Sequence, residues 1–212
     1  MATLTIKPTA AGNDVQIKSG DGNTTHATFG DTNNISMSTG SIASAVTGTL
    51  GSGIVFPAGH ILQTVQYAED QHSTWSSSST WRDMGMDLSI TLSNASHKVL
   101  VTVLLHVGAA SDGYLHYRVE RNGSDLALGV ARSTCTRCLF MTNIDSGHGQ
   151  HEIMITGITY LDDPSETTIT PLAYKIYSHA QNGQQHLNRC EDGADYNRGQ
   201  PVSTITLQEI AV

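Results

Sequence analysis

The longest apolar run of the chain, residues 99–107, limits what this sequence can fold into. Only Thr102 and His106 interrupt the run, which otherwise consists of valine and leucine. Side chains of an extended chain alternate between two faces, and here both faces are apolar: Val99, Val101, Val103 and Leu105 on one, Leu100 and Leu104 on the other. The run is rich in β-branched residues and too short to cross a bilayer. It therefore predicts a central β-strand with both faces covered.

A hairpin signal follows directly. Residues 114–121 alternate apolar and polar side chains, which is typical of a strand with one wet face. Asn122 and Gly123 come next, and this dipeptide favours a two-residue turn because both central positions need positive φ. With further alternation at 86–92 and 203–212, the pattern predicts roughly eight antiparallel strands and no convincing helix. We expect an all-β, jelly-roll-like sandwich over residues 58–212.

Composition narrows the possible partners. Only 14% of the residues are charged, the chain has 20 glycines, and the formal net charge is -8. Without a cluster of lysine or arginine, this balance argues against nucleic acid as a partner. No segment is long and apolar enough to insert into a membrane, and no export signal is visible. We therefore expect a soluble chain.

The first quarter of the chain, residues 1–57, has a different pattern. Its apolar residues are sparse and separated by turn dipeptides, which predicts very short strands. One copy of such a segment buries too little surface to offset the entropy of ordering it. It is therefore either disordered or wrapped around a partner, most simply two further copies of itself. In that trimeric shaft the core candidates are Ile17, Phe29, Ile35, Ile42 and Val46. The conformation of residues 41–53 stays open.

The three cysteines leave several alternatives. Cys135 and Cys138 have the spacing of half a zinc site, but a second pair is missing and only Cys190 remains. Free thiols, a disulfide from Cys190 to either of the others, and a metal site are all compatible with this pattern. We favour free thiols made in a reducing compartment, with no metal and no cofactor.

The sequence contains no catalytic motif. There is no nucleophile elbow and no phosphate-binding glycine loop. Carboxylates such as Asp162 and Asp163 lie in turn-like contexts where solvation explains them. His148 lies near Asp145, and His186 lies in another long loop, but their spacing matches no ligand pair on a helix. Ten histidines in the chain make chance proximity common. We expect no enzymatic activity.

Several segments resemble the terminal knob of tail-fibre proteins of marine tailed bacteriophages. The segments are GHILQTVQ (59–66), the spaced pattern W-x-x-x-G-M-x-L-S-I-T-L (81–92), KVLVTV (98–103), YRVERNG (117–123), LDDP (161–164), YKIY (174–177) and STITLQEI (203–210). Residues 17–42 resemble the attachment or shaft segment that precedes such knobs. The three cysteines are not part of this pattern, and the chain is short for a complete fibre.

The resemblance implies a homotrimeric, non-enzymatic fibre exposed on the virion, with a knob laid out like C1q/TNF-like trimers. Residues 1–57 would attach to a tail adaptor or capsid, or form the shaft, and the knob would contact a glycan or protein receptor of the host. The loops at 68–82, 133–150 and 181–200 are the expected receptor-facing segments. Within them Trp75, His148 and His186 are the candidate contacts, while Trp81 is expected in the core. A capsid head fibre or decoration protein is the alternative, and a small glycan-degrading spike a lesser one.

Overall fold

A computed structural model describes residues 56–76, 78–109, 113–144, 152–181, 183–190 and 199–212, together with the backbones of three strands nearer the N-terminus. The chain forms two compact units, Met1–Ile54 and Val55–Val212. Within the described part, no helix is long and apolar enough to span a bilayer.

The first unit contains a three-stranded antiparallel sheet. Its strands are β1 (Val15–Lys18), β2 (Thr25–Phe29) and β3 (Ile35–Ser36), with β2 in the centre. Phe29 is paired with both Val15 and Ile35. The predicted very short strands are therefore present. Of the predicted shaft residues, Ile42 and Val46 lie outside the described residues.

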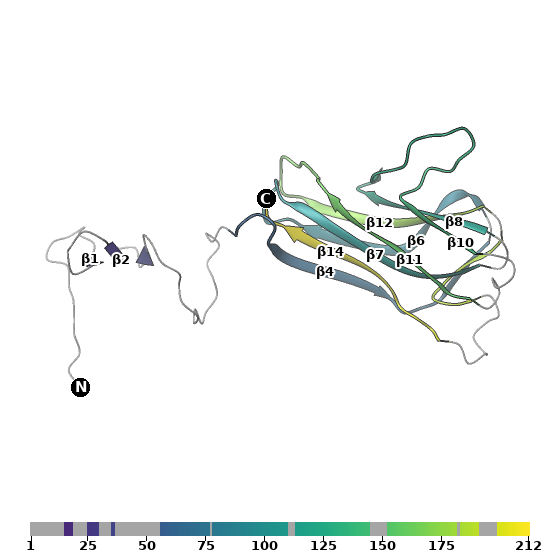
Figure 1. The fold of residues 1–212 in the computed structure, drawn as a ribbon, viewed down its shortest axis with the longest axis horizontal. Coiled ribbons are helices and arrows are strands. Elements are labelled where there is room, and N and C mark those ends of the chain that lie inside the picture. Colours follow the sequence, from purple (N-terminus) through teal and green to yellow (C-terminus); the bar gives the residue numbers. More distant parts are fainter. Residues whose placement is uncertain are drawn as a thin grey trace. The chain divides into compact units, whose positions relative to one another are not determined.

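The second unit is a sandwich of two antiparallel sheets (Figure 1). The six-stranded sheet consists of β4 (Ile61–Glu69), β14 (Ser203–Ile210), β7 (Lys98–Ala109), β13 (Gln185–Leu187) and β5 (Ser73–Trp75), with β11 (Met154–Asp162) on the free edge of β7. The five-stranded sheet consists of β10 (Phe140–Ile144), β8 (Gly113–Arg121), β12 (Pro171–Ala180) and β6 (Ser78–Thr91), with β9 (Ser124–Asp125) pairing with β8. The all-β, jelly-roll-like prediction is confirmed.

The predicted hairpin is also confirmed. Asn122 and Gly123 have φ values of 49° and 81°, and Arg121 pairs with Ser124 across the turn. Both central residues therefore adopt the left-handed conformation that a tight two-residue turn requires. The turn fixes the register between β8 and β9.

The core lies between the sheets. One face of β7 provides valines and a leucine that are at most 2% exposed, and β8 and β12 provide the fully buried Tyr117 and Tyr174 from the opposite sheet. The inward residues are those that the alternation predicted: Val99, Val101, Val103, Leu105 and Val107 from β7, and Ile205 and Leu207 from β14.

Two expected loops contain strands. The loop expected at 68–82 includes β5 and the start of β6, and the one expected at 181–200 includes β13. The described knob thus has eleven strands, β4–β14, instead of roughly eight. These additional strands are short or rich in polar residues. Backbone pairing holds them in place: β13 pairs with β7, β5 pairs with β13, and β6 pairs with β12. Apolar alternation cannot detect such strands.

Candidate functional site

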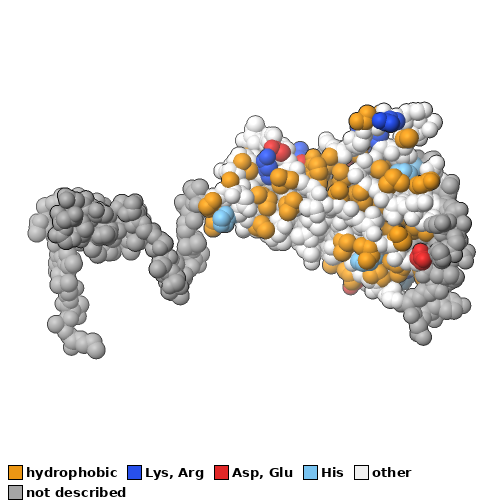
Figure 2. Space-filling model, viewed as in Figure 1, with side chains coloured by type: hydrophobic (Ala, Val, Ile, Leu, Met, Phe, Trp, Pro, Cys, Tyr) orange, Lys and Arg blue, Asp and Glu red, His pale blue; other side chains and the backbone are white. Residues whose placement is uncertain are grey.

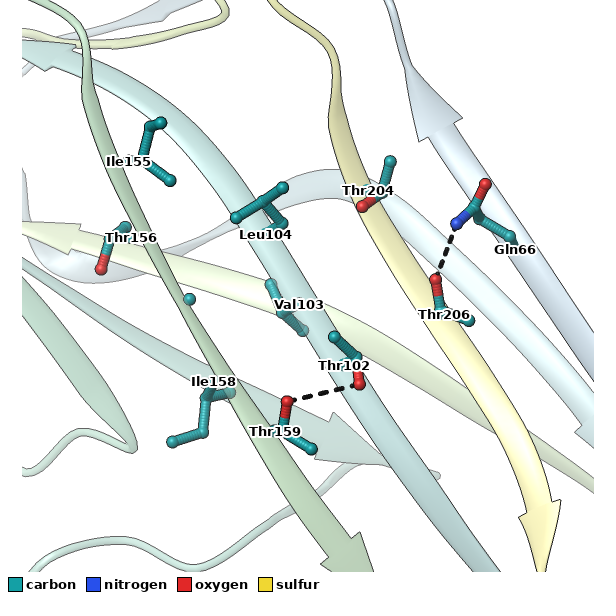
Figure 3. A pocket seen from close by; sticks show the side chains of 11 residues that line it. Gln66, Thr102, Val103, Leu104, Ile155, Thr156, Ile158, Thr159, Thr204 and Thr206 are labelled. Carbon is teal, nitrogen blue, oxygen red and sulfur yellow. Dashed lines mark hydrogen bonds between the residues drawn. The ribbon is translucent and has the colours of Figure 1, made fainter. Parts of the chain in front are cut away.

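The outer surface of the six-stranded sheet is the main candidate site, and we call it the open face. It is formed by side chains of four adjacent strands that point away from the core (Figure 3). Its members are uncharged: Gln66 from β4, Thr204 and Thr206 from β14, Thr102 and Leu104 from β7, and Ile155, Gly157 and Thr159 from β11. Hydrophobic and other uncharged side chains dominate the side of the knob shown in Figure 2.

Hydrogen bonds between side chains tie the polar groups of the open face together. Gln66 Nε2 donates to Thr206 Oγ1 at 2.9 Å, and the hydroxyls of Thr102 and Thr159 lie 3.5 Å apart (Figure 3). A hollow of about 570 Å³ lies among these side chains. Because these four polar side chains are already paired with each other, they can be desolvated at lower cost than isolated polar groups.

The apolar side chains of the open face are exposed. Leu104 is 40% exposed and Ile155 is 65% exposed, whereas Val103, which points to the core, is 2% exposed. The prediction that both faces of the central run are covered is therefore wrong for a single copy of the chain. Among the described residues, a second layer covers only the inner face, and the outer side chains Leu104 and Ile155 are exposed to water.

The open face ends at an unprotected edge strand. β11 pairs with β7 without interruption from Met154 to Asp162, and no strand among the described residues pairs with its other edge. Edge strands are usually protected by a lysine, a proline or a bulge. β11 has none of these, and its first charged residue is Asp162 at its end.

Gly157 shapes the hollow. A Cβ atom at this position would meet the carbonyl oxygen of Val103 well inside van der Waals contact and would also crowd Leu104. The close approach of β11 to β7 therefore requires glycine here.

We expect Gly157→Val to separate the two strands locally and to lower the free energy of unfolding by about 1–3 kcal/mol, the usual range for overpacking. Chemical denaturation followed by tryptophan fluorescence measures this change. Thr159→Val, on the same face of the same strand, is the matched control and should change stability by less than about 1 kcal/mol. Equal effects of the two variants would contradict the close-approach argument.

The two tryptophans occupy positions opposite to those expected. Trp75 is partly buried and packs against the core from β5. Trp81 lies on the outer side of the five-stranded sheet, where the Arg118 guanidinium lies 4.7 Å from its ring centre and the His179 ring 5.5 Å away. The guanidinium also lies 5.0 Å from the Tyr177 ring. A cation–π contact of this kind stabilises Trp81 in its position on the outer side of the sheet.

His186 is buried, at 2% exposure, on β13. Its Nδ1 lies 2.9 Å from Thr74 Oγ1, and its Nε2 has no hydrogen-bond partner among the described residues. Burial, and to a lesser extent the nearby Arg189, lowers the pKa of His186 to about 4. The structure thus places this imidazole inside the protein. His148 lies outside the described residues and stays a prediction.

Cys135 and Cys138 precede β10 of the five-stranded sheet, and Cys190 follows β13 of the six-stranded sheet. Cys135 is exposed, Cys138 is half-buried, and both are unbridged thiols on the segment before β10. Burial raises the pKa of the Cys138 thiol. Cys190 is 2% exposed and lies against Gly108 of the six-stranded sheet. Within the described part of the chain, no group of three His, Cys, Asp or Glu side chains could hold a metal ion.

Asp162 is not the solvated turn residue that we expected. It is 4% exposed, its carboxylate is 2.5 Å from Arg121 Nη1, and it accepts a hydrogen bond of 2.7 Å from the Tyr174 hydroxyl. Burial, followed by this bond to Asp162, raises the pKa of Tyr174. The Asp162 carboxylate is thus held inside the fold by an ion pair with Arg121 and a hydrogen bond from Tyr174.

Comparisons with known proteins identify no family. No protein-family model and no curated protein matches the chain. Solved structures with some likeness are dimeric latent PorU from Porphyromonas gingivalis, the infectious bursal disease virus Gx strain and the VP2 subviral particle of infectious bursal disease virus. Their TM-scores are 0.41, 0.35 and 0.34, with identities of 9%, 11% and 11%. They cover 77%, 83% and 79% of this chain, which spans 14%, 48% and 42% of theirs. These values are too low to assign a family or a function.

Proposed function

We propose that this chain is a non-enzymatic structural protein of a virus particle, a homotrimeric tail fibre whose β-sandwich knob takes part in host attachment. The proposal combines the resemblance of the sequence to phage fibre knobs with the surface of the described knob. The open face is the intersubunit contact in this proposal, and the first unit is the attachment or shaft segment.

The observation that carries the proposal is the incomplete cover of β7. Its sequence is that of a strand buried on both sides, yet Leu104 and the neighbouring Ile155 are exposed on the open face. Interface cores are depleted of charged residues, as this face is. Two copies of a chain with net charge -8 repel each other over most of their surfaces, but they can meet on an uncharged face.

The two ends of the sandwich have the arrangement expected of a knob that is attached through the end where the chain enters it. Ile61 pairs with Ile210, and Gly59 donates a backbone hydrogen bond to Ala211, so the chain enters the sandwich where its C-terminal strand ends. The opposite end contains the beginning of β14 and the end of β4, because Ser203 pairs with Glu69. In a fibre, that opposite end would face the host. Loops held by a rigid scaffold commonly supply such contacts.

Native mass measurement of the full chain tests the proposal, and we expect the mass of a trimer. Leu104→Glu places a charge in the open face and should convert the trimer largely to smaller species, since an unpaired buried charge strongly destabilises an interface. Met141→Glu is the matched control because Met141 is similarly exposed, at 46%, on the other sheet.

The control variant should remain trimeric. A monomeric wild-type chain at micromolar concentration, or a Leu104→Glu variant that assembles like the wild type, would contradict the proposed contact. Circular dichroism of both variants checks that the sandwich itself is intact.

A further inference from the structure

The segment between β9 and β10, residues 126–139, projects from the sandwich, and we call it the finger (Figure 1). Its backbone is internally tied. Gly129 N donates to the Cys138 carbonyl at 3.3 Å, Cys135 N donates to the Arg132 carbonyl at 2.8 Å, and Arg137 Nε donates to the Gly129 carbonyl at 2.7 Å. Its base is held by Leu139 N, which donates to the carbonyl of Tyr117. The finger is thus an ordered projection.

The finger carries positive charge on an acidic protein. Residues 126–139 include Arg132 and Arg137, both exposed, and no aspartate or glutamate, whereas the whole chain has a net charge of -8. The acidic residue nearest in sequence, Asp125, is engaged by Arg118 at 3.2 Å. Neither finger guanidinium forms an ion pair with a described residue. Because both side chains are exposed, their charges can reach an external anion.

An apolar side chain accompanies these charges. Val130 is 87% exposed, the highest value among the large exposed hydrophobic residues of the described chain. Charged and hydrophobic side chains lie next to each other on this projection in Figure 2. Arginines beside a small apolar surface match a ligand that offers both anionic groups and C–H surfaces.

We propose that the finger binds an anionic polysaccharide, a polymer that carries carboxylate groups on its sugar rings. Arg132 and Arg137 would each contact carboxylates in the bidentate manner that guanidinium groups allow, and Val130 would pack against the apolar face of a sugar. This inference rests on the proposed attachment role, because three fingers in a trimer would convert weak single contacts into firm binding.

Two other partner classes fit less well. A protein interface needs about 1,000 Å² of complementary surface, and one exposed valine with two arginines on a narrow projection offers far less. Nucleic acid is disfavoured because affinity for a phosphate backbone grows with the number of Lys and Arg contacts, and the chain has no basic cluster beyond the finger pair. A carbohydrate with repeated carboxylates needs only small, repeated contacts.

Surface plasmon resonance on carboxymethyl-dextran, with unmodified dextran as reference, tests the inference with the full chain. We expect binding to the carboxylated polymer alone at about 50 mM salt, and its loss at about 500 mM, where charges are screened beyond a few ångströms. The double variant R132S/R137S should bind at least about tenfold more weakly because both charge-assisted contacts are lost.

R82S/K98S is the control for bulk charge, since it removes the same charge outside the finger, from the exposed Arg82 and the partly buried Lys98, and it should bind within about twofold of the wild type. Equal losses in both double variants would show that bulk charge causes binding, and full binding by R132S/R137S would show that the finger is not the site. Absence of wild-type binding would also overturn the inference.

Native mass measurement distinguishes this test from the test of trimer assembly. R132S/R137S should keep the wild-type mass, and a smaller species would make the finger an intersubunit contact instead.

Discussion

Replacement of Glu209 by alanine is expected to lower the free energy of unfolding of the knob by about 3–5 kcal/mol, because it removes a buried charge whose partners stay behind. Glu209 is 1% exposed on β14. Its carboxylate accepts hydrogen bonds from Ser93 N and Oγ at 2.6 and 2.7 Å, from Gln63 Nε2 at 2.7 Å, and lies 2.7 Å from His97 Nδ1. These groups connect β14 with β4 and with the turn after β6.

The pKa of Glu209 reflects this balance. Burial alone would raise it, but the hydrogen bonds from Ser93, His97 and Gln63 together outweigh burial and lower it. The folded state therefore favours the carboxylate, and its contribution to stability is present above the normal pKa of about 4.5 and is lost as the pH falls through the lowered value.

Urea denaturation at pH 7, at fixed protein concentration, measures the effect of the Glu209 variant. Both tryptophans belong to the second unit, so their fluorescence reports its unfolding. Gln208→Ala is the matched control on the same strand, because Gln208 makes only an exposed hydrogen bond with Thr64 and should cost less than about 1 kcal/mol. A loss below about 1 kcal/mol in Glu209→Ala would show that the carboxylate network does not support the fold.

The sequence was sufficient for the centre of the sandwich. The alternating valines of β7 predict its buried face, and Asn122-Gly123 predicts the hairpin. Each of these predictions needs only a few adjacent residues, because local backbone geometry determines the structure. The strands β5 and β13 could not be predicted, since each has three residues and depends on pairing with strands distant in sequence. The buried partners of Asp162 are likewise distant in sequence, and nothing near Asp162 in the sequence indicates them.

The open face could have been recognised in part. In β14 the outward positions Thr204, Thr206 and Gln208 are uncharged, and β11 places Thr159 and Gly157 outward in the same way. A solvated face normally carries charged side chains at some of these positions. Alternating threonine without charge was therefore a signal that this face differs from an ordinary solvated one. The position of Trp81 depends on Arg118 from another strand and left no such signal.

Acidification is expected to lower the free energy of unfolding of the knob strongly. Among the described residues, His186 is expected to make the main contribution to this loss. Its pKa in the folded protein is about 4, against 6.5 for the free side chain, because it is buried and lies near Arg189. The unfolded chain therefore binds a proton near pH 6.5, whereas the folded chain does so only near pH 4. Stability is highest above pH 6.5 and falls as the pH drops through this window, by about 3 kcal/mol at 1.36 kcal/mol per pKa unit.

Urea denaturation at several pH values between 7.5 and 4 tests this expectation. In His186→Gln the fall in stability across the window should be about 3 kcal/mol smaller than in the wild type, even if the variant is less stable at pH 7.5. His116, whose pKa is lowered by burial and by His179, should leave a residual slope with the same sign. Thr74→Val removes the hydroxyl near Nδ1 but keeps the imidazole buried, so this control should retain the steep fall. If His186→Gln loses stability toward pH 4 as steeply as the wild type, then His186 is not the group that resists protonation, and the buried imidazole does not set the acid sensitivity of the knob.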